Sequence, residues 1–135
     1  SIIASMAGSS FRSFSVLKTP RPPNLMCFAP PFLAMPGEER GCLAVFSAPL
    51  NASSEPVILR GHSGTITALA TAATSETQVV IYSAATDGSV LMRFSRRSGL
   101  FNSAQPEEAV SGLGYVSSLA ASPNGERLAA CVGSS

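Results

Sequence analysis

The chain has 135 residues, of which 45% are hydrophobic and 13% are charged, and its formal net charge is +1. This composition excludes a disordered chain, because such chains are poor in apolar residues and rich in net charge. A net charge this small gives no bulk attraction to nucleic acid, so we expect no nucleic-acid partner. The apolar runs are shorter than the ~18 residues that span a bilayer. The first residue is Ser1, with no charged n-region, so we expect no signal peptide and a cytoplasmic location.

Short apolar runs recur along the chain, separated by Gly, Pro, Ser and Asn residues. Their β-branched content and their alternating stretches are typical of strands, and pairs such as Asp87-Gly88 are typical of hairpin turns. The alanine-rich stretch Thr65–Ala73 also allows a helix, but its Thr and Ile residues favour a strand. We therefore expect an all-β meander with strands at Phe14–Lys18, Leu25–Ala29, Phe32–Met35, Cys42–Ala48, Pro56–Leu59, Thr65–Ala72, Gln78–Ala84, Ser89–Ser95, Val116–Ala121 and Arg127–Val132.

Three stretches of the sequence resemble one another and begin at Asn24, Gly64 and Tyr115. Each reads as strand, turn, strand ending in small residues, tight turn and strand. Their starts are about 40 and about 50 residues apart, and a period of ~40–45 residues with four strands per unit is typical of a β-propeller. The expected blades are residues 24–59, 64–111 and an incomplete 115–135, with residues 1–23 as the end of a preceding blade.

The second unit resembles a WD40 repeat. Gly61-His62 precedes its first strand, Ser83 ends the second, Asp87-Gly88 forms a turn, and Phe94 closes the third strand. The resemblance implies a hydrogen-bonded structural network of His62, Ser83 and Asp87. In that family tryptophan is a fourth member, but Phe94 stands near its place and cannot donate a hydrogen bond.

Within that superfamily the chain is most similar to the PROPPIN family, the phosphoinositide-binding seven-bladed propellers of autophagy. The resemblance covers roughly residues 16–135, and its best-matched pieces are Leu33-Ala34-Met35-Pro36-Gly37 and Val45-Phe46. It implies a non-catalytic scaffold that recruits autophagy or endosomal machinery to phosphoinositide-bearing membranes as a peripheral membrane protein. The alternative is a WD40 scaffold that binds protein partners without binding lipid.

The sequence departs from the PROPPIN pattern where that family binds lipid. A Phe-Arg-Arg-Gly signature is expected just before Val116, but the chain has the acidic stretch Glu107–Gly112 there. The only local basic cluster is Arg93, Arg96 and Arg97. It is a candidate phosphate-binding site, because guanidinium groups meet phosphate oxygens bidentately. The alternative is a solvated turn between two strands.

Other chemistry finds little support in the sequence. His62, Ser83 and Asp87 are residue types of a nucleophilic triad, but no hydrolase signature accompanies them, so we expect no enzyme. One histidine and three scattered cysteines lack the spacing of a zinc site, and we expect no metal and no cofactor. We expect Cys27, Cys42 and Cys131 to be buried, reduced thiols.

The length is too small for the expected fold. A closed seven-bladed ring needs roughly 300 residues at ~40–45 per blade, so we expect the chain to form about three blades, as a fragment or an incomplete propeller. Unpaired strand edges favour self-association or contact with the remaining blades.

Overall fold

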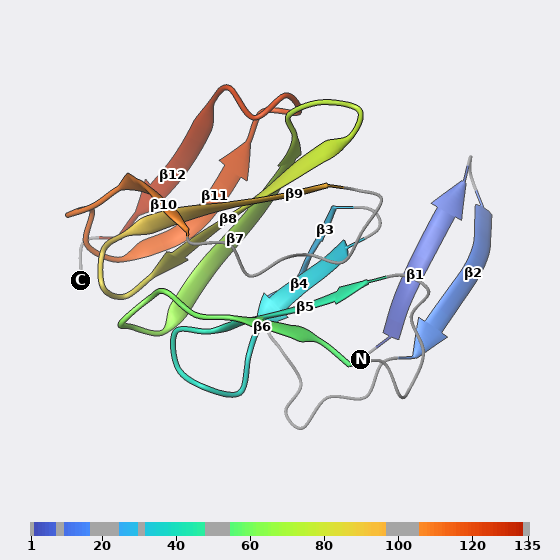
Figure 1. The fold of residues 1–135 in the computed structure, drawn as a ribbon, viewed down its shortest axis with the longest axis horizontal. Helices are drawn as coiled ribbons and strands as arrows, with labels where there is room; N and C mark the ends of the chain where they lie inside the picture. Colours follow the sequence, from blue (N-terminus) through green and yellow to red (C-terminus); the bar gives the residue numbers. More distant parts are fainter. Residues whose placement is uncertain are drawn as a thin grey trace.

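The computed structural model describes the backbone of residues 2–7, 10–16, 25–29, 32–47, 55–96 and 106–133, and side chains in the last four ranges except at 29 and 94–96. This part of the chain folds into antiparallel strands without a helix (Figure 1), which confirms the expected all-β class. Accordingly, no helix in the described ranges could cross a membrane.

The first four-stranded sheet is an antiparallel meander in the order β3-β4-β5-β6. The turn between β4 and β5 is closed by the Gly37 amide, which donates to the Cys42 carbonyl at 2.8 Å. All of β4 except Pro36, and all of β5 except Ser47, is buried. The bounds are β3 Cys27–Ala29, β4 Phe32–Pro36, β5 Leu43–Ser47 and β6 Val57–Leu59.

The second four-stranded sheet follows as another meander, in the order β10-β9-β8-β7. Residues of β7 alternate between buried and half-buried, as expected for a strand with one face in the core. The alanine-rich stretch Thr65–Ala73, for which the sequence also allowed a helix, therefore forms a strand from Ile66 onward. The sequence missed β10, because its two glutamates do not resemble a strand. The bounds are β7 Ile66–Ala73, β8 Gln78–Ala85, β9 Val90–Arg96 and β10 Glu107–Val110.

Two hairpins complete the described chain. Strands β1 (Ile2–Ala7) and β2 (Ser10–Val16) pair only with each other among the described strands, as do β11 (Val116–Ala121) and β12 (Leu128–Val132). Strand β1 was not expected, and the expected strand Phe14–Lys18 is shifted toward the N-terminus, with Lys18 outside the described residues. The two hairpins lie at opposite ends of the molecule (Figure 1).

The first strands of three successive sheets are neighbours. Strand β7 contacts β3 on one side and β11 on the other (Figure 1). Hydrogen bonds fasten the β11–β12 hairpin, and the connection that leads into it, to the second sheet. At the hairpin's turn the Ala73 amide donates to the Pro123 carbonyl at 3.0 Å and the Tyr82 hydroxyl to the Gly125 carbonyl at 3.0 Å. In the β10–β11 connection the Leu113 amide donates to the Gly88 carbonyl at 3.1 Å.

Strand β8 is buried on both faces and separates two hydrophobic cores. Val79, Ile81 and Ala85 belong to the core shared with the first sheet, whereas Val80, Tyr82 and Ala84 belong to the core under the β11–β12 hairpin. Only a strand that is covered on both sides has this nearly continuous burial. The second sheet is therefore the middle layer of the described structure.

Truncating a buried side chain of β8 should destabilise the fold strongly. Ile81 is fully buried, so we expect Ile81→Ala to lower the free energy of unfolding by about 2–5 kcal/mol, through lost burial and a residual cavity. Val110→Ala, at a side chain that is 40% exposed, is the control and should change it by less than about 1 kcal/mol. Urea unfolding measures both, and equal losses would contradict the two-core description.

Candidate functional site

A group of hydrogen-bonded polar side chains lies where the β6–β7 connection meets the turn between β8 and β9. The two segments are held together by backbone contact, since the Thr86 amide donates to the Thr65 carbonyl at 2.9 Å. They approach so closely at Gly64 that an added Cβ would collide with Thr86 Oγ1 and would lie 2.8 Å from the Asp87 amide nitrogen. Glycine is thus required at this position by space.

The turn itself is shaped by Asp87-Gly88, as the sequence indicated. The Gly88 amide donates to the Ala85 carbonyl at 3.1 Å, and Gly88 has a φ of +83°, in the left-handed region that favours glycine. Asp87 Oδ1 accepts hydrogen bonds from the Ser89 amide at 3.0 Å and from Ser89 Oγ at 2.7 Å. The carboxylate therefore closes the turn onto the start of β9.

His62 reaches from the β6–β7 connection to both ends of this turn. Its Nε2 lies 2.9 Å from Ser83 Oγ, and its Nδ1 lies 3.3 Å from Asp87 Oδ2 and 3.1 Å from Ser89 Oγ. With the proton on Nδ1, the ring donates to the Asp87 carboxylate and accepts from the Ser83 hydroxyl. The structure thus brings His62, Ser83 and Asp87 into one hydrogen-bonded cluster.

Two serines that the sequence analysis did not single out belong to the same cluster. Asp87 Oδ2 accepts from the Ser63 amide at 2.9 Å and from Ser63 Oγ at 3.3 Å, and Ser89 binds the other carboxylate oxygen. Ser89 has a signal in the sequence, because an aspartate side chain commonly accepts from the amide two residues later. Ser63 has no such signal, because it lies 24 residues away from Asp87 along the chain. We refer to Ser63, His62, Ser83, Asp87 and Ser89 as the histidine cluster.

Electrostatics hold the carboxylate of the histidine cluster in its ionised form. Partial burial alone would raise the pKa of Asp87. The hydrogen bonds from Ser89 and Ser63 and the proximity of His62 outweigh it and hold that pKa well below its ordinary value of 3.8. The imidazole and the Ser83 hydroxyl are enclosed, since the His62 side chain is 2% exposed and Ser83 is 1% exposed, whereas Ser63 is exposed.

The order hydroxyl, imidazole, carboxylate is also that of a nucleophilic triad. A nucleophile must reach its substrate, but Ser83 lies within β8 and its hydroxyl faces the His62 ring. What this arrangement achieves is the pairing of buried polar groups that would otherwise be costly to leave unpaired. It fastens the β6–β7 connection to the second sheet.

The candidate phosphate-binding arginines are only partly described. Arg93 is 5% exposed, and its guanidinium donates to the Arg60 carbonyl, while its Nε has no hydrogen-bond partner among the described residues. Burial lowers the pKa of Arg93. The side chain of Arg96, the whole of Arg97 and the side chain of Phe94 lie outside the described residues.

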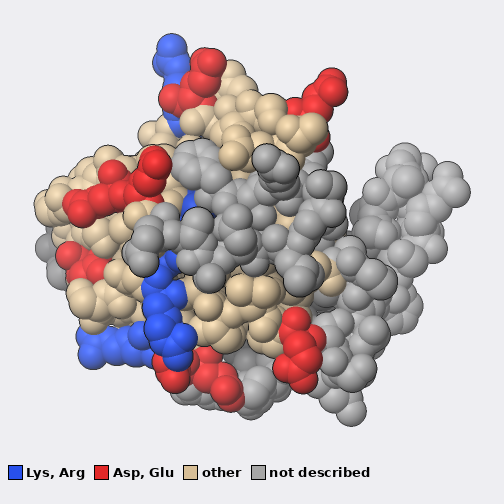
Figure 2. Space-filling view, viewed as in Figure 1, with Lys and Arg blue, Asp and Glu red and all other residues tan. Residues whose placement is uncertain are grey.

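Charged side chains on the surface are mixed in sign. On the face drawn in Figure 2, the described basic and acidic side chains lie among one another. The one exposed Arg–Glu pair, among described residues, joins Arg60 Nη2 to Glu39 Oε2 at 2.8 Å. Such exposed pairs contribute at most about 1 kcal/mol. Glu107 and Glu108 are exposed on β10.

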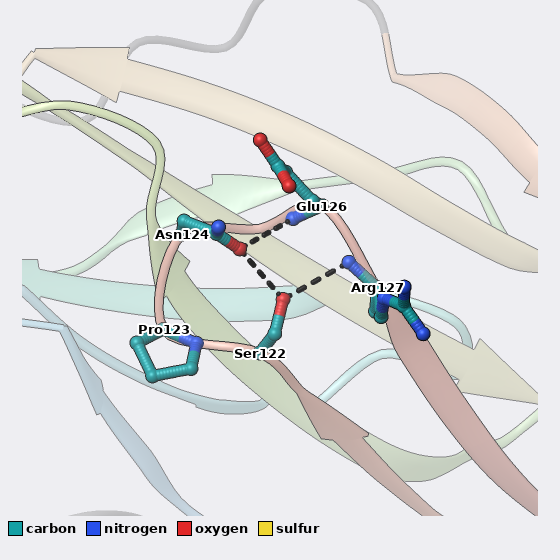
Figure 3. A pocket seen from close by; sticks show the side chains of 5 residues that line it. All are labelled: Ser122, Pro123, Asn124, Glu126 and Arg127. Carbon is teal, nitrogen blue, oxygen red and sulfur yellow. Dashed lines mark hydrogen bonds between the residues drawn. The ribbon is translucent and has the colours of Figure 1, made fainter.

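A shallow hollow of about 300 Å³ lies at the turn between β11 and β12 (Figure 3). Its polar atoms mainly shape the turn, since Ser122 Oγ donates to Asn124 Oδ1 at 2.8 Å and accepts from the Arg127 amide at 2.9 Å. The Glu126 amide also donates to Asn124 Oδ1 at 3.0 Å. We therefore assign these residues to the architecture of the turn.

The cysteines differ from the expectation in one respect. Cys42 is buried and Cys27 is half-buried, but Cys131 is exposed on β12, so the expectation that all three are buried was wrong there. Burial raises the pKa of Cys27 to about 12, and it also raises that of Cys42. In the described part of the chain, no three His, Cys, Asp or Glu side chains lie close enough together to hold a metal ion.

Comparison with protein-family models, with curated proteins and with solved structures finds no match to this chain. The interpretation of the histidine cluster therefore depends on the contacts within the chain.

The histidine cluster should make stability depend on acid pH. Because the folded pKa of Asp87 is below its ordinary value, its contribution is fully present above pH 3.8 and is lost as the pH falls below that value. We expect Asp87→Asn to lower the free energy of unfolding by about 1–3 kcal/mol at pH 7, and the deficit to shrink toward pH 2. Urea unfolding at several pH values measures this. Glu76→Gln, at an exposed carboxylate, should show no such loss, and a pH-independent deficit for Asp87→Asn would contradict the assignment.

The three thiols should react at very different rates. The thiolate is the reactive form, so burial and a raised pKa slow Cys27 and Cys42. We expect one fast-reacting thiol with a chromogenic disulfide reagent in the native protein and three after unfolding. Cys131→Ser should remove the fast phase and Cys42→Ser should leave it, and a fast phase that survives Cys131→Ser would contradict the placement of β12.

Proposed function

We propose that the chain is part of a non-catalytic WD40-type β-propeller that acts as a scaffold for protein partners. The observation that carries this proposal is the succession of two four-stranded antiparallel meanders, with the first strands β3, β7 and β11 lying side by side (Figure 1). Blades around a common axis have this arrangement. The sheets span residues 27–59 and 66–110, within the ranges expected from the repeat.

The histidine cluster supports the WD40-type assignment. In a WD40 repeat the residue before the first strand, the end of the second strand and the following turn are linked by hydrogen bonds, and here His62, Ser83 and Asp87 occupy those places. The contacts of Ser63 and Ser89 with the Asp87 carboxylate strengthen the same junction.

Burial of Ser83 supports a non-catalytic role. Ser83 is 1% exposed, and a triad serine must present its oxygen to a substrate beside donors for the developing oxyanion. Ser83 instead lies between the two cores that flank β8. We propose that the Ser83 hydroxyl has a structural role, as a hydrogen-bond partner of His62.

The charges favour protein partners over phosphoinositide headgroups. Where a PROPPIN-like chain would carry its two arginines, this chain presents Glu107 and Glu108, both exposed, and carboxylates repel phosphate. Arg93 is buried against the Arg60 carbonyl, which leaves Arg96 and Arg97 as the remaining basic pair. We propose that recruitment of autophagy or endosomal machinery, which the resemblance implies, occurs here through protein contacts.

Flotation with lipid vesicles tests the choice of partner. We expect the protein to stay in the lower fraction with neutral vesicles and with vesicles that contain phosphatidylinositol 3-phosphate, because the acidic stretch opposes headgroup binding. Flotation with the phosphoinositide vesicles that is abolished by Arg96→Ala/Arg97→Ala, and retained in the control Arg40→Ala, would overturn the protein-only proposal in favour of lipid recognition.

A further inference from the structure

The turn between β11 and β12 contains a chemically labile pair of residues, Asn124-Gly125. The backbone nitrogen that follows an asparagine can attack the carbon of its side-chain amide, and glycine hinders this ring closure least because it has no side chain. The other asparagines of the chain, Asn24, Asn51 and Asn102, are each followed by a residue that has a side chain. Asn124 is therefore the asparagine at which the sequence most favours deamidation.

The reaction at Asn124 needs no reagent other than water. The Gly125 nitrogen bonds to Asn124 Cγ, the Cγ–Nδ2 bond breaks, and the Gly125 amide proton is taken up in the ammonia that departs, which leaves a succinimide ring. Water opens this ring at either carbonyl carbon. Opening at Cγ gives an aspartate with the ordinary backbone, whereas opening at the backbone carbon gives isoaspartate, in which the chain runs through the side chain and gains a methylene group. Asn124 is exposed, so water reaches it.

The native turn opposes ring closure, because both reacting groups are already engaged. The Gly125 amide donates to the Ser122 carbonyl at 2.9 Å, and a succinimide nitrogen carries no proton, so this hydrogen bond is lost when the ring forms. The side-chain carbonyl is held as well, since Asn124 Oδ1 accepts from Ser122 Oγ at 2.8 Å and from the Glu126 amide at 3.0 Å (Figure 3). The reaction is therefore slow while the turn is closed.

The second sheet fastens the backbone on both sides of Asn124. The carbonyl of the preceding residue, Pro123, accepts from the Ala73 amide at 3.0 Å, and the carbonyl of the following residue, Gly125, accepts from the Tyr82 hydroxyl at 3.0 Å. Tyr82 is buried in β8. Opening of the turn therefore requires local detachment of the hairpin from the second sheet, a type of opening that proteins undergo without global unfolding.

We propose that Asn124 is a deamidation site whose rate is controlled by docking of the β11–β12 hairpin on the second sheet. Each local detachment frees the Gly125 nitrogen for ring closure, and docking prevents it. The isoaspartate product lengthens the turn and moves the Pro123 and Gly125 carbonyls away from their donors on the second sheet. The modification thereby makes detachment of the turn permanent. This inference does not depend on the proposed scaffold function.

Peptide mass spectrometry of the full chain, incubated at mildly alkaline pH, tests the control by folding. We expect the peptide that contains Asn124 to deamidate at least about tenfold more slowly in the native protein than in urea, because only the open fraction of the native protein reacts. The variant Asn124→Asp has no amide to lose and identifies the reacting residue. Equal rates in the native and the unfolded protein would overturn the proposal.

Removal of one fastening hydrogen bond tests the control by the second sheet. We expect Tyr82→Phe to speed deamidation of the native protein about five- to tenfold, the effect of one lost hydrogen bond on the opening equilibrium, and to leave the rate in urea unchanged. The matched control is Tyr115→Phe, at a tyrosine that is 45% exposed and lies outside this turn, and it should leave both rates unchanged. A native rate in Tyr82→Phe equal to that of the unaltered chain would overturn the proposal.

The product gives an answer even if Tyr82→Phe fails to fold. Protein deamidated in urea is refolded, and its isoaspartate form is separated by chromatography and compared with Asn124→Asp, which carries the same charge on an ordinary backbone. We expect hydrogen exchange at the Ala73 amide to be about tenfold faster in the isoaspartate form, because this amide has lost its acceptor, and to stay slow in Asn124→Asp. Slow exchange in both forms, or fast exchange in both, would contradict release of the turn by the lengthened backbone.

Discussion

Side chains of β8 point alternately into two cores, one shared with the first sheet and one under the β11–β12 hairpin. Because this strand is covered on both faces, a change that loosens one core also removes support from the other. Burial of this kind supplies most of the driving force for folding. The first sheet and the β11–β12 hairpin each pack against one side of the second sheet.

The histidine cluster provides a hydrogen-bond partner for a polar group that is buried in β8. Ser83 is the one polar residue in the buried run of β8, and a buried hydroxyl without a partner is destabilising. His62 satisfies it, and the Asp87 carboxylate orients His62 in turn. The cluster thus joins the end of the buried strand to the β6–β7 connection.

Alternation and turn residues predicted most strands, because those signals are local. They failed at β10, whose two exposed glutamates contribute backbone pairing without an apolar pattern, and at β1. The members His62, Ser83 and Asp87 were found through the resemblance to a repeat. The roles of Ser63 and Ser89 and the burial of Arg93 were not, because they depend on which segments approach each other in space. Exposure of Cys131 is likewise set by its place on an edge.

The β11–β12 hairpin is fastened to the second sheet at its turn, through Ala73 and Tyr82, and the β10–β11 connection that leads into it is fastened at Gly88. Apolar packing is non-directional, and the small alanine side chains at this interface make its surface smooth. Packing alone would therefore let the hairpin slide along the sheet. These two fixed points set the alignment of the two layers. The distance between the Gly88 turn and the Pro123–Gly125 turn therefore determines how the hairpin is aligned along the second sheet.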